Sequence, residues 1–221
     1  MNISTAEFAA AHRWRLGIPV EGTESWHFCP GCTARFDRNR QLQEHLVSCA
    51  RLRGHNSTTT HHGVNHAVQH ISRLSNVEYT NEPRYSSFAP KGDDAEEHEQ
   101  GPDTTLYLLP LPLTIDVKGV GLANKSHLRK SVRTIETSRK TRAVELYAPH
   151  CHANGETFEA VVFHYTGALC TDFVSVLRRL VGPADEAGHL SFEDARLMVQ
   201  VAIIRGIGRT LLALRRRGAM L

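Results

Sequence analysis

The chain has 221 residues, of which 41% are hydrophobic and 22% are charged, and its formal net charge is +3. These values are ordinary for a globular protein, and the length suffices for one hydrophobic core plus a small appendage. The small positive charge permits a nucleic-acid partner without requiring one.

Cysteine usage and the apolar runs indicate the compartment. Five cysteines, an odd number in a chain without an export signal, argue against a disulfide framework. The N-terminus lacks the basic-then-apolar order of a secretion signal, and no apolar run is judged long enough to span a bilayer. We therefore expect an intracellular protein with reduced thiols, in the nucleus or the cytosol, without a membrane partner.

The most specific motif lies near the N-terminus. A Cys-x2-Cys-x12-His-x3-Cys array is formed by Cys29, Cys32, His45 and Cys49, with Phe36 and Leu42 at the core positions of a small ββα finger. The first two cysteines place two thiolates on one ion, and a histidine and a cysteine one helical turn apart offer two more ligands. A unit this small does not fold without its metal. We predict a structural zinc finger at 25–52, after a helical segment at 1–24.

Two roles for this finger remain open. In a DNA-reading finger, residues at the helix start face the bases, which here are Arg38, Gln41 and Glu44. Arg38 and Arg40 can equally contact phosphates. Because one finger covers only about three base pairs, it cannot specify a site alone. The alternative is a structural clip that holds one module against another.

The stretch 101–121, GPDTTLYLLPLPLTIDVKGVG, predicts a β-hairpin. Two apolar strands, Thr104–Leu109 and Leu113–Val117, are joined by a Pro-Leu-Pro turn that cannot be helical. If the strands pair antiparallel, the end of the second lies beside Asp103 at the start of the first. Residues two apart on a strand share a face, so Asp116 and Lys118 point the same way.

This hairpin brings two carboxylates and one ammonium group to one end. Carboxylates are the oxygen ligands that Mg²⁺ prefers, and a nearby lysine can orient or activate a water molecule. The arrangement predicts a metal-dependent phosphodiester hydrolase. The alternative is a turn aspartate, Asp103, next to a solvated strand end.

The segments around the hairpin predict an α/β fold. We expect a helix at His62–Leu74, a strand at Val77–Glu82 and a mobile acidic loop at 84–101. After the hairpin come a basic helix at Lys125–Tyr147, a turn at 149–152, a strand at Phe158–Tyr165 and helices beginning at Thr171 and Ser191. This order predicts a mixed sheet flanked by helices in a domain at 53–221.

Two helices carry patterns with a predicted orientation. On the first, His62, His66 and His70 are four residues apart; a second metal site is one interpretation, and solvated or phosphate-facing histidines are the alternative. On the last helix, the apolar stripe Leu197, Val201, Ile204 and Leu211 is expected to pack inward.

Together these residues resemble the C-terminal end of site-specific non-LTR retrotransposon reverse transcriptases that carry a restriction-like endonuclease. The matching pieces are the Cys-Cys-His-Cys array, His61-His62 before Val64, Glu82-Pro83, Pro102-Asp103, Asp116-Val117, Lys140 ahead of Tyr147, and Phe158 through Tyr165-Thr166-Gly167. The likeness spans nearly the whole chain through short motifs. Nothing in the chain resembles a polymerase domain, which would make it a truncated element, a gene fragment or a domesticated remnant.

The resemblance implies a PD-(D/E)xK restriction-endonuclease-like core and a nuclear location. By it, Asp103 and Asp116 would bind Mg²⁺, while Lys118 or Lys140 would serve the attacking water. The enzyme would nick one DNA strand, and the freed 3′-hydroxyl would prime reverse transcription. The finger would grip the target DNA or the element's RNA, and Arg38, Arg40, Gln41, His61, His62 and Arg139 are the candidate nucleic-acid contacts.

Three hypotheses therefore stand. The first is an Mg²⁺-dependent DNA endonuclease with a structural zinc. The second is a zinc-dependent nucleic-acid-binding protein whose nuclease fold no longer cuts. The third is a finger protein whose second domain serves protein contacts.

Overall fold

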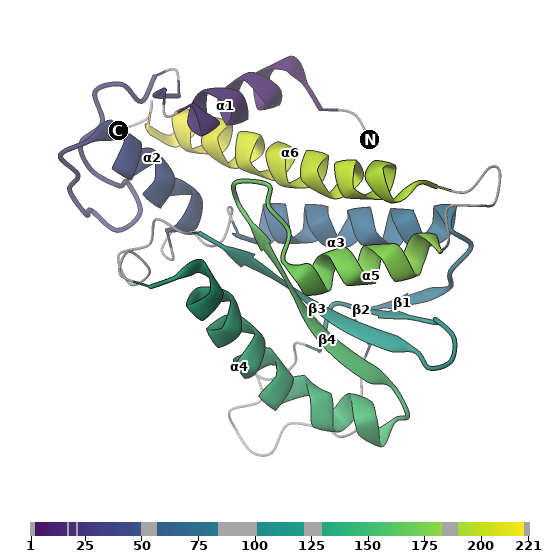
Figure 1. Ribbon diagram of the computed structural model, residues 1–221. Helices are drawn as coiled ribbons and strands as arrows, with labels where there is room; N and C mark the ends of the chain where they lie inside the picture. The colour runs from purple at the N-terminus through teal and green to yellow at the C-terminus, as the bar shows by residue number, and fades with distance from the viewer. Residues whose placement is uncertain are drawn as a thin grey trace.

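The computed structural model describes residues 3–16, 18–20, 22–49, 57–83, 101–121, 130–182 and 190–218 (Figure 1). Its helices are α1 (Thr5–Arg15), α2 (Asn39–Ser48), α3 (Ser57–Leu74), α4 (Val132–Ala153), α5 (Thr171–Val181) and α6 (Phe192–Gly218). Its strands are β1 (Tyr79–Asn81), β2 (Thr104–Leu106), β3 (Leu113–Val120) and β4 (Thr157–His164). The order from α3 onward is the predicted one: helix, three strands, helix, strand and two helices. The expected loop at 84–101 and the start of the basic helix, 125–129, lie outside the described residues except for Gly101.

The four strands form one mixed sheet in the order β1-β2-β3-β4. The first three strands are antiparallel neighbours, and β4 runs parallel to β3. A parallel neighbour requires a crossover connection, and the segment that contains α4 supplies it. The predicted α/β architecture with a mixed sheet and flanking helices is therefore confirmed.

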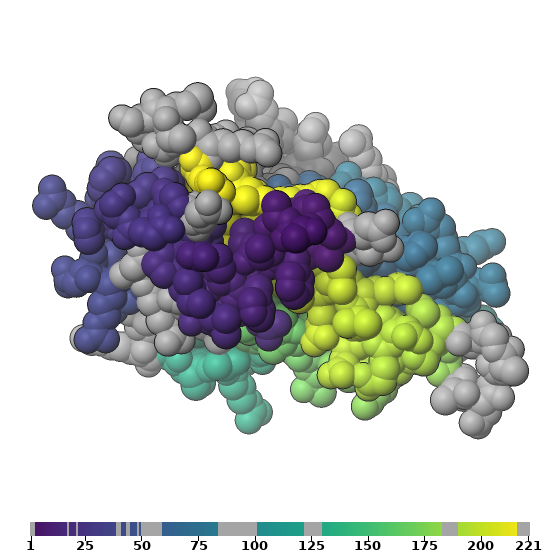
Figure 2. Space-filling view, turned by 90° about the horizontal axis from the view of Figure 1, so that it is seen from above, coloured from purple at the N-terminus to yellow at the C-terminus, as the bar shows by residue number. Residues whose placement is uncertain are grey.

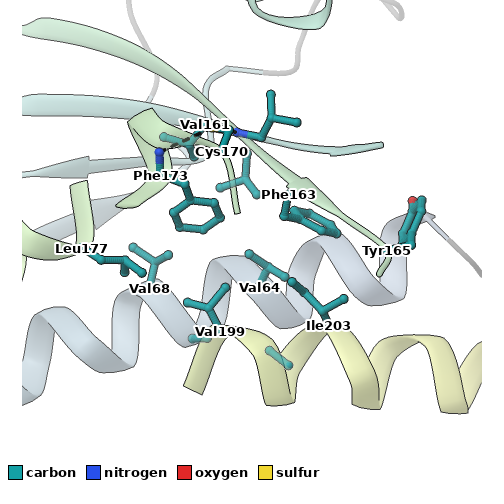
Figure 3. Close-up of a cluster of buried hydrophobic side chains, with 14 of the residues drawn as sticks. Val64, Val68, Val161, Phe163, Tyr165, Cys170, Phe173, Leu177, Val199 and Ile203 are labelled. Carbon is teal, nitrogen blue, oxygen red and sulfur yellow. Dashed lines mark hydrogen bonds between the residues drawn. The ribbon is translucent and has the colours of Figure 1, made fainter. Parts of the chain in front are cut away.

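The helices cover the sheet unequally. The main core lies on one face, where side chains of β4 meet α3, α5 and α6; Figure 3 shows Val161 and Phe163 above Val64 and Val68 of α3. On the other face, Ala143, Tyr147 and Cys151 of α4 pack on Ala160 of β4. In Figure 1, α6 lies between α3 and α1, so α1 is the outermost layer on the core side.

Helix α4 continues through the predicted turn. Residues 149–152, including Pro149, lie inside its last turns, and the helix ends at Ala153. The prediction of a turn at 149–152 is therefore wrong. A proline in a helix removes one backbone hydrogen bond, and here burial of Tyr147 and Cys151 against the sheet stabilises the helix on both sides of it.

Helix α6 follows its predicted orientation only in part. Of the predicted stripe, Leu211 is buried and Ile204 packs against the core, but Leu197 is 56% exposed. The buried face comprises Ala195, Val199, Ala202, Ile203, Ile207, Leu211 and Leu214. The helix is apolar on most sides, so its sequence fits more than one inward face. Over Phe192–Arg215 it is also long and apolar enough to cross a membrane by length and composition, contrary to the sequence-based expectation. Half of that apolar window is buried in the fold, and one such helix is weak evidence for a membrane span.

Two glycines let α6 approach its neighbours closely. A Cβ added at Gly208 would overlap the carbonyl group of Glu7 in α1, and one added at Gly206 would lie 2.6 Å from the Cα of Thr60 in α3. The Glu7 side chain stabilises the contact between α1 and α6. It accepts hydrogen bonds from Arg209 Nε at 2.6 Å and from the Ser4 backbone N–H at 2.9 Å. Figure 2 shows α1 lying over α6.

We expect Gly208→Ala to lower the free energy of unfolding by about 1–3 kcal/mol, because a methyl group there forces the two helices apart. Gly63→Ala in α3 is the matched control, since its Cβ would meet only Ala202 O at an ordinary 3.6 Å. The control should gain up to about 1 kcal/mol from helix propensity. Urea denaturation measures both, and a Gly208→Ala protein as stable as the control would contradict the packing argument.

Candidate functional site

The pairing of β2 with β3 brings the two predicted acids together. Thr104 pairs with Ile115, so Asp103 and Asp116 lie opposite each other one residue further along. Both are buried, with 8% and 3% of their surface exposed. We refer to Asp103, Asp116, Lys118 and His61 as the acidic centre.

Asp103 is held by two hydrogen bonds to one oxygen. Its Oδ2 accepts from the backbone N–H of Val117 at 2.6 Å and lies 3.0 Å from Nε2 of His61. Burial by itself lowers the pKa of His61, but the hydrogen bond and the negative charge of Asp103 outweigh it, so the pKa is raised. His61 therefore stays protonated to a higher pH than a free histidine, which stabilises the Asp103 carboxylate.

Asp116 is paired with the lysine two residues later. Lys118 Nζ lies 2.9 Å from Oδ1 and 2.7 Å from Oδ2 of Asp116. Burial raises the pKa of Asp116 to about 6; the Lys118 ammonium opposes this shift and the Asp103 charge adds to it. The negative charge on Asp116 is thus costly and would be favoured by additional positive charge.

The other candidate lysine lies elsewhere. Lys140 of α4 forms an ion pair with Asp172 of α5, and that contact and the charges around it raise its pKa despite burial. Of the two lysines, Lys118 is the one beside Asp116. Arg139, one residue before Lys140, is exposed.

Helix α4 contributes Tyr147 near the acidic centre. Burial raises the pKa of this phenol to about 12, and the charges of Asp116 and Asp103 add to the shift. Tyr147 therefore remains a neutral hydroxyl at physiological pH. In the sequence, Tyr147 is only the tyrosine that follows Lys140 in the matching motif, and no role is predicted for it.

Helix α3 presents two different polar faces. His62 and His66 are exposed and His70 is half-buried, which fits solvated or phosphate-facing residues better than a buried metal site. His61, proposed above as a nucleic-acid contact, instead reaches Asp103. It shares its face with two residues that the sequence does not single out, Asn65 and Gln69, which lie four and eight residues after it.

These two amides anchor α3 to the sheet edge. Thr104 Oγ1 donates to Asn65 Oδ1 at 2.8 Å, and Gln69 Nε2 donates to Asn81 Oδ1 at 2.6 Å. Polar residues four apart on a helix face that is otherwise apolar were the available signal. Their bonds hold α3 against β1 and β2 and so position His61.

The donor atoms of the acidic centre fit a small hard cation. Mg²⁺ is usually held by one or two carboxylates together with waters and substrate phosphates. Asp116 Oδ2 is buried, and among the described residues its polar contact is the Lys118 ammonium group at 2.7 Å, which a bound cation could replace. Asp103 and Asp116 would supply two protein ligands, and water or phosphate oxygens would fill the other coordination positions.

The predicted zinc ligands also converge. The ligand atoms of Cys29, Cys32, His45 and Cys49 all lie within 4.8 Å of one another. Burial raises the pKa of the Cys29 thiol to about 12, although backbone N–H groups of the Cys-x2-Cys turn lower it. Positive charge from a bound metal ion would favour the thiolate, and the four side chains can hold a metal ion such as zinc.

The finger packs against the C-terminal part of α6. Leu42 and Leu46 of α2 share a buried cluster with Cys29, Cys49 and Leu214 of α6. Arg38 and Gln41, the proposed nucleic-acid contacts at the start of α2, are exposed. The side chains of Arg40 and Glu44 lie outside the described residues. The contact with α6 favours the role of a structural clip. It leaves the start of α2 exposed, so a nucleic-acid contact there remains possible as well.

No protein-family model matches the chain, and the search of curated proteins gives no match either.

We expect the purified protein to contain one zinc ion per chain and Cys49→Ala to lose it, because three ligands hold zinc less tightly than a closed set of four. Cys151→Ala removes a buried cysteine outside the cluster and should retain the metal. Atomic absorption measures the metal content. Full zinc occupancy in Cys49→Ala would rule out this ligand set.

We expect Asp116→Asn to raise stability near pH 7.5, because the unfolded carboxyl ionises at a lower pH than the folded one. A raised folded pKa stabilises the protein below the unfolded value and loses that contribution as the pH rises through about 6. The gain should be on the order of 1–3 kcal/mol near pH 7.5 and shrink toward pH 4.

Denaturation of both proteins at each pH tests this, since zinc release at low pH cancels in their difference. Asp172→Asn is the control: this half-exposed partner of Lys140 should show at most about 1 kcal/mol of change. A loss of stability in Asp116→Asn at neutral pH would contradict a raised pKa.

Proposed function

We propose that the chain is a metal-dependent DNA endonuclease of the PD-(D/E)xK type, which nicks one strand of its target. The observation that carries the proposal is the meeting of Asp103, Asp116 and Lys118 at one end of the β2–β3 hairpin. The mixed sheet flanked by helices and the Cys-Cys-His-Cys cluster support it, because both are parts of the region that the sequence resembles.

The four residues of the acidic centre have distinct roles in this proposal. Asp103 and Asp116 would hold the divalent cation, which when bound would supply positive charge to the phosphate and favour ionisation of the attacking water. His61 is a positioning residue that fixes the Asp103 carboxylate through its 3.0 Å contact. Once Asp116 is engaged by the cation, Lys118 Nζ is available to orient the attacking water or a phosphate oxygen.

The reaction is a hydrolysis in which water attacks the phosphorus atom. A new P–O bond forms to the water oxygen and the P–O3′ bond breaks, with one water proton passing to the departing 3′-oxygen. The products are a 3′-hydroxyl and a 5′-phosphate. A free 3′-hydroxyl is the end that a polymerase can extend, in keeping with the retrotransposon resemblance.

A second function is favoured by one observation. Lys118 bonds directly to Asp116, and the acidic pair is balanced by Lys118 and His61 without any cation. A fold with this internal balance can persist as a zinc-dependent nucleic-acid-binding protein that does not cut. The two functions share their binding features and differ only in chemistry.

We expect the wild-type protein to nick supercoiled plasmid in the presence of Mg²⁺. Asp116→Asn should abolish nicking, and Lys118→Met should lower its rate about 100-fold or more, the usual size of a proton-transfer contribution. Lys140→Met, which removes the partner of Asp172, is the control and should retain activity. Gel electrophoresis separates nicked from supercoiled circles.

Equal nicking by wild type and Asp116→Asn would remove the acidic centre as the catalytic site. DNA binding without nicking by the wild-type protein would select the non-cutting alternative.

A further inference from the structure

The finger carries an aromatic hollow on the side of its β-hairpin. Phe28 and Arg35 pair across an isolated antiparallel bridge, and Phe36 N donates to His27 O at 2.9 Å. A hollow of about 520 Å³ is lined by His27, Phe28, Arg35, Phe36 and Asp37. Its size lies within the range of small-ligand sites.

Phe28 is not part of the finger core. The buried cluster of the finger includes Leu42 and Leu46, with Phe36 packed against it and tilted by 36° against the His45 ring at 4.8 Å between ring centroids. Phe28 instead leaves 51% of its surface exposed. The finger therefore keeps an aromatic face toward solvent that its own folding does not use.

The charges around this ring suit a nucleic acid. Arg35 lies directly across the bridge from Phe28 and lines the hollow together with His27 and one acidic residue, Asp37. The next residue after Asp37, Arg38, is exposed. An aromatic face binds an unpaired base by stacking, while arginine stacks on a neighbouring base or pairs with a phosphate. Bases inside a duplex are already stacked and cannot reach such a ring.

The attachment of the finger leaves this side available. The finger attaches to the rest of the fold through its helix: Leu42 and Leu46 of α2 are buried in one cluster with Leu214 of α6. The hairpin residues that line the hollow take no part in that cluster apart from Phe36. The finger can therefore contact α6 through its helix and still bind a ligand through its hairpin.

We propose that the hollow binds one unpaired nucleobase of single-stranded DNA or RNA, stacked on Phe28 with its phosphate near Arg35. This site is separate from the acidic centre and from the base-reading positions at the start of α2. It gives the finger a preference for unpaired strands, and it requires no cutting chemistry.

The test measures fluorescence anisotropy of a labelled single-stranded oligonucleotide and of its duplex with the full zinc-loaded chain. Magnesium is omitted, so the result does not depend on the proposed nuclease activity. Phe28→Ala should weaken single-strand binding by roughly 5- to 100-fold, the range that corresponds to loss of one base–aromatic stack. Duplex binding should change little.

Three variants sharpen the result. Phe28→Trp should retain the affinity because it keeps a stacking face, and Phe28→Leu should lose it despite remaining apolar. Phe8→Ala is the matched control: Phe8 is 50% exposed on α1, far from the finger in sequence. Zinc content confirms that each variant keeps a folded finger.

Unchanged single-strand affinity in Phe28→Ala would overturn the proposal and leave the hollow to a protein partner. An equal loss for single strand and duplex, or full affinity in Phe28→Leu, would also overturn it, because neither is compatible with stacking of an unpaired base. RNA and DNA versions of the oligonucleotide distinguish the two sources of the base.

Discussion

The antiparallel register of β2 against β3 is the constraint on which the acidic centre depends. It places Asp103 opposite Asp116 in a buried position, where two like charges repel each other and neither is well solvated. The fold compensates with Lys118 on β3, His61 on α3 and the backbone N–H of Val117. A slip of the register by one residue would turn these side chains to the other face and dismantle the centre.

Helix α6 connects this centre to the finger. At Gly206 it contacts Thr60, the residue before His61, and near its C-terminal end Leu214 enters the finger core. At Gly208 it meets α1, whose Glu7 is ion-paired with Arg209. Burial raises the pKa of Glu7, but the Ser4 and Arg209 hydrogen bonds outweigh it and lower the pKa, so the ion pair persists at neutral pH. The contacts of this one helix thus fix how closely α3, α1 and the finger pack together.

The two centres differ in how completely the protein provides them. The Cys-Cys-His-Cys cluster offers four possible metal ligands from one local segment, and a closed set of four is typical of a structural site. The acidic centre offers only two carboxylates, so a cation bound there would complete its coordination with other ligands. Its raised Asp116 pKa shows that the fold bears an electrostatic cost at the position where a cation would relieve it.

The sequence by itself determined the features that short spacing encodes. The Cys-Cys-His-Cys array needs only one turn and one helix, and the meeting of Asp103 with Asp116 follows from a hairpin whose turn is marked by prolines. Tertiary structure decided the rest. His61 rather than His62 faces inward because Asn65 and Gln69 bind the sheet edge, and Lys140 is drawn to Asp172 on a helix distant in sequence. The inward face of α6 was also open, because a helix apolar on most sides is oriented by where its glycines permit contact.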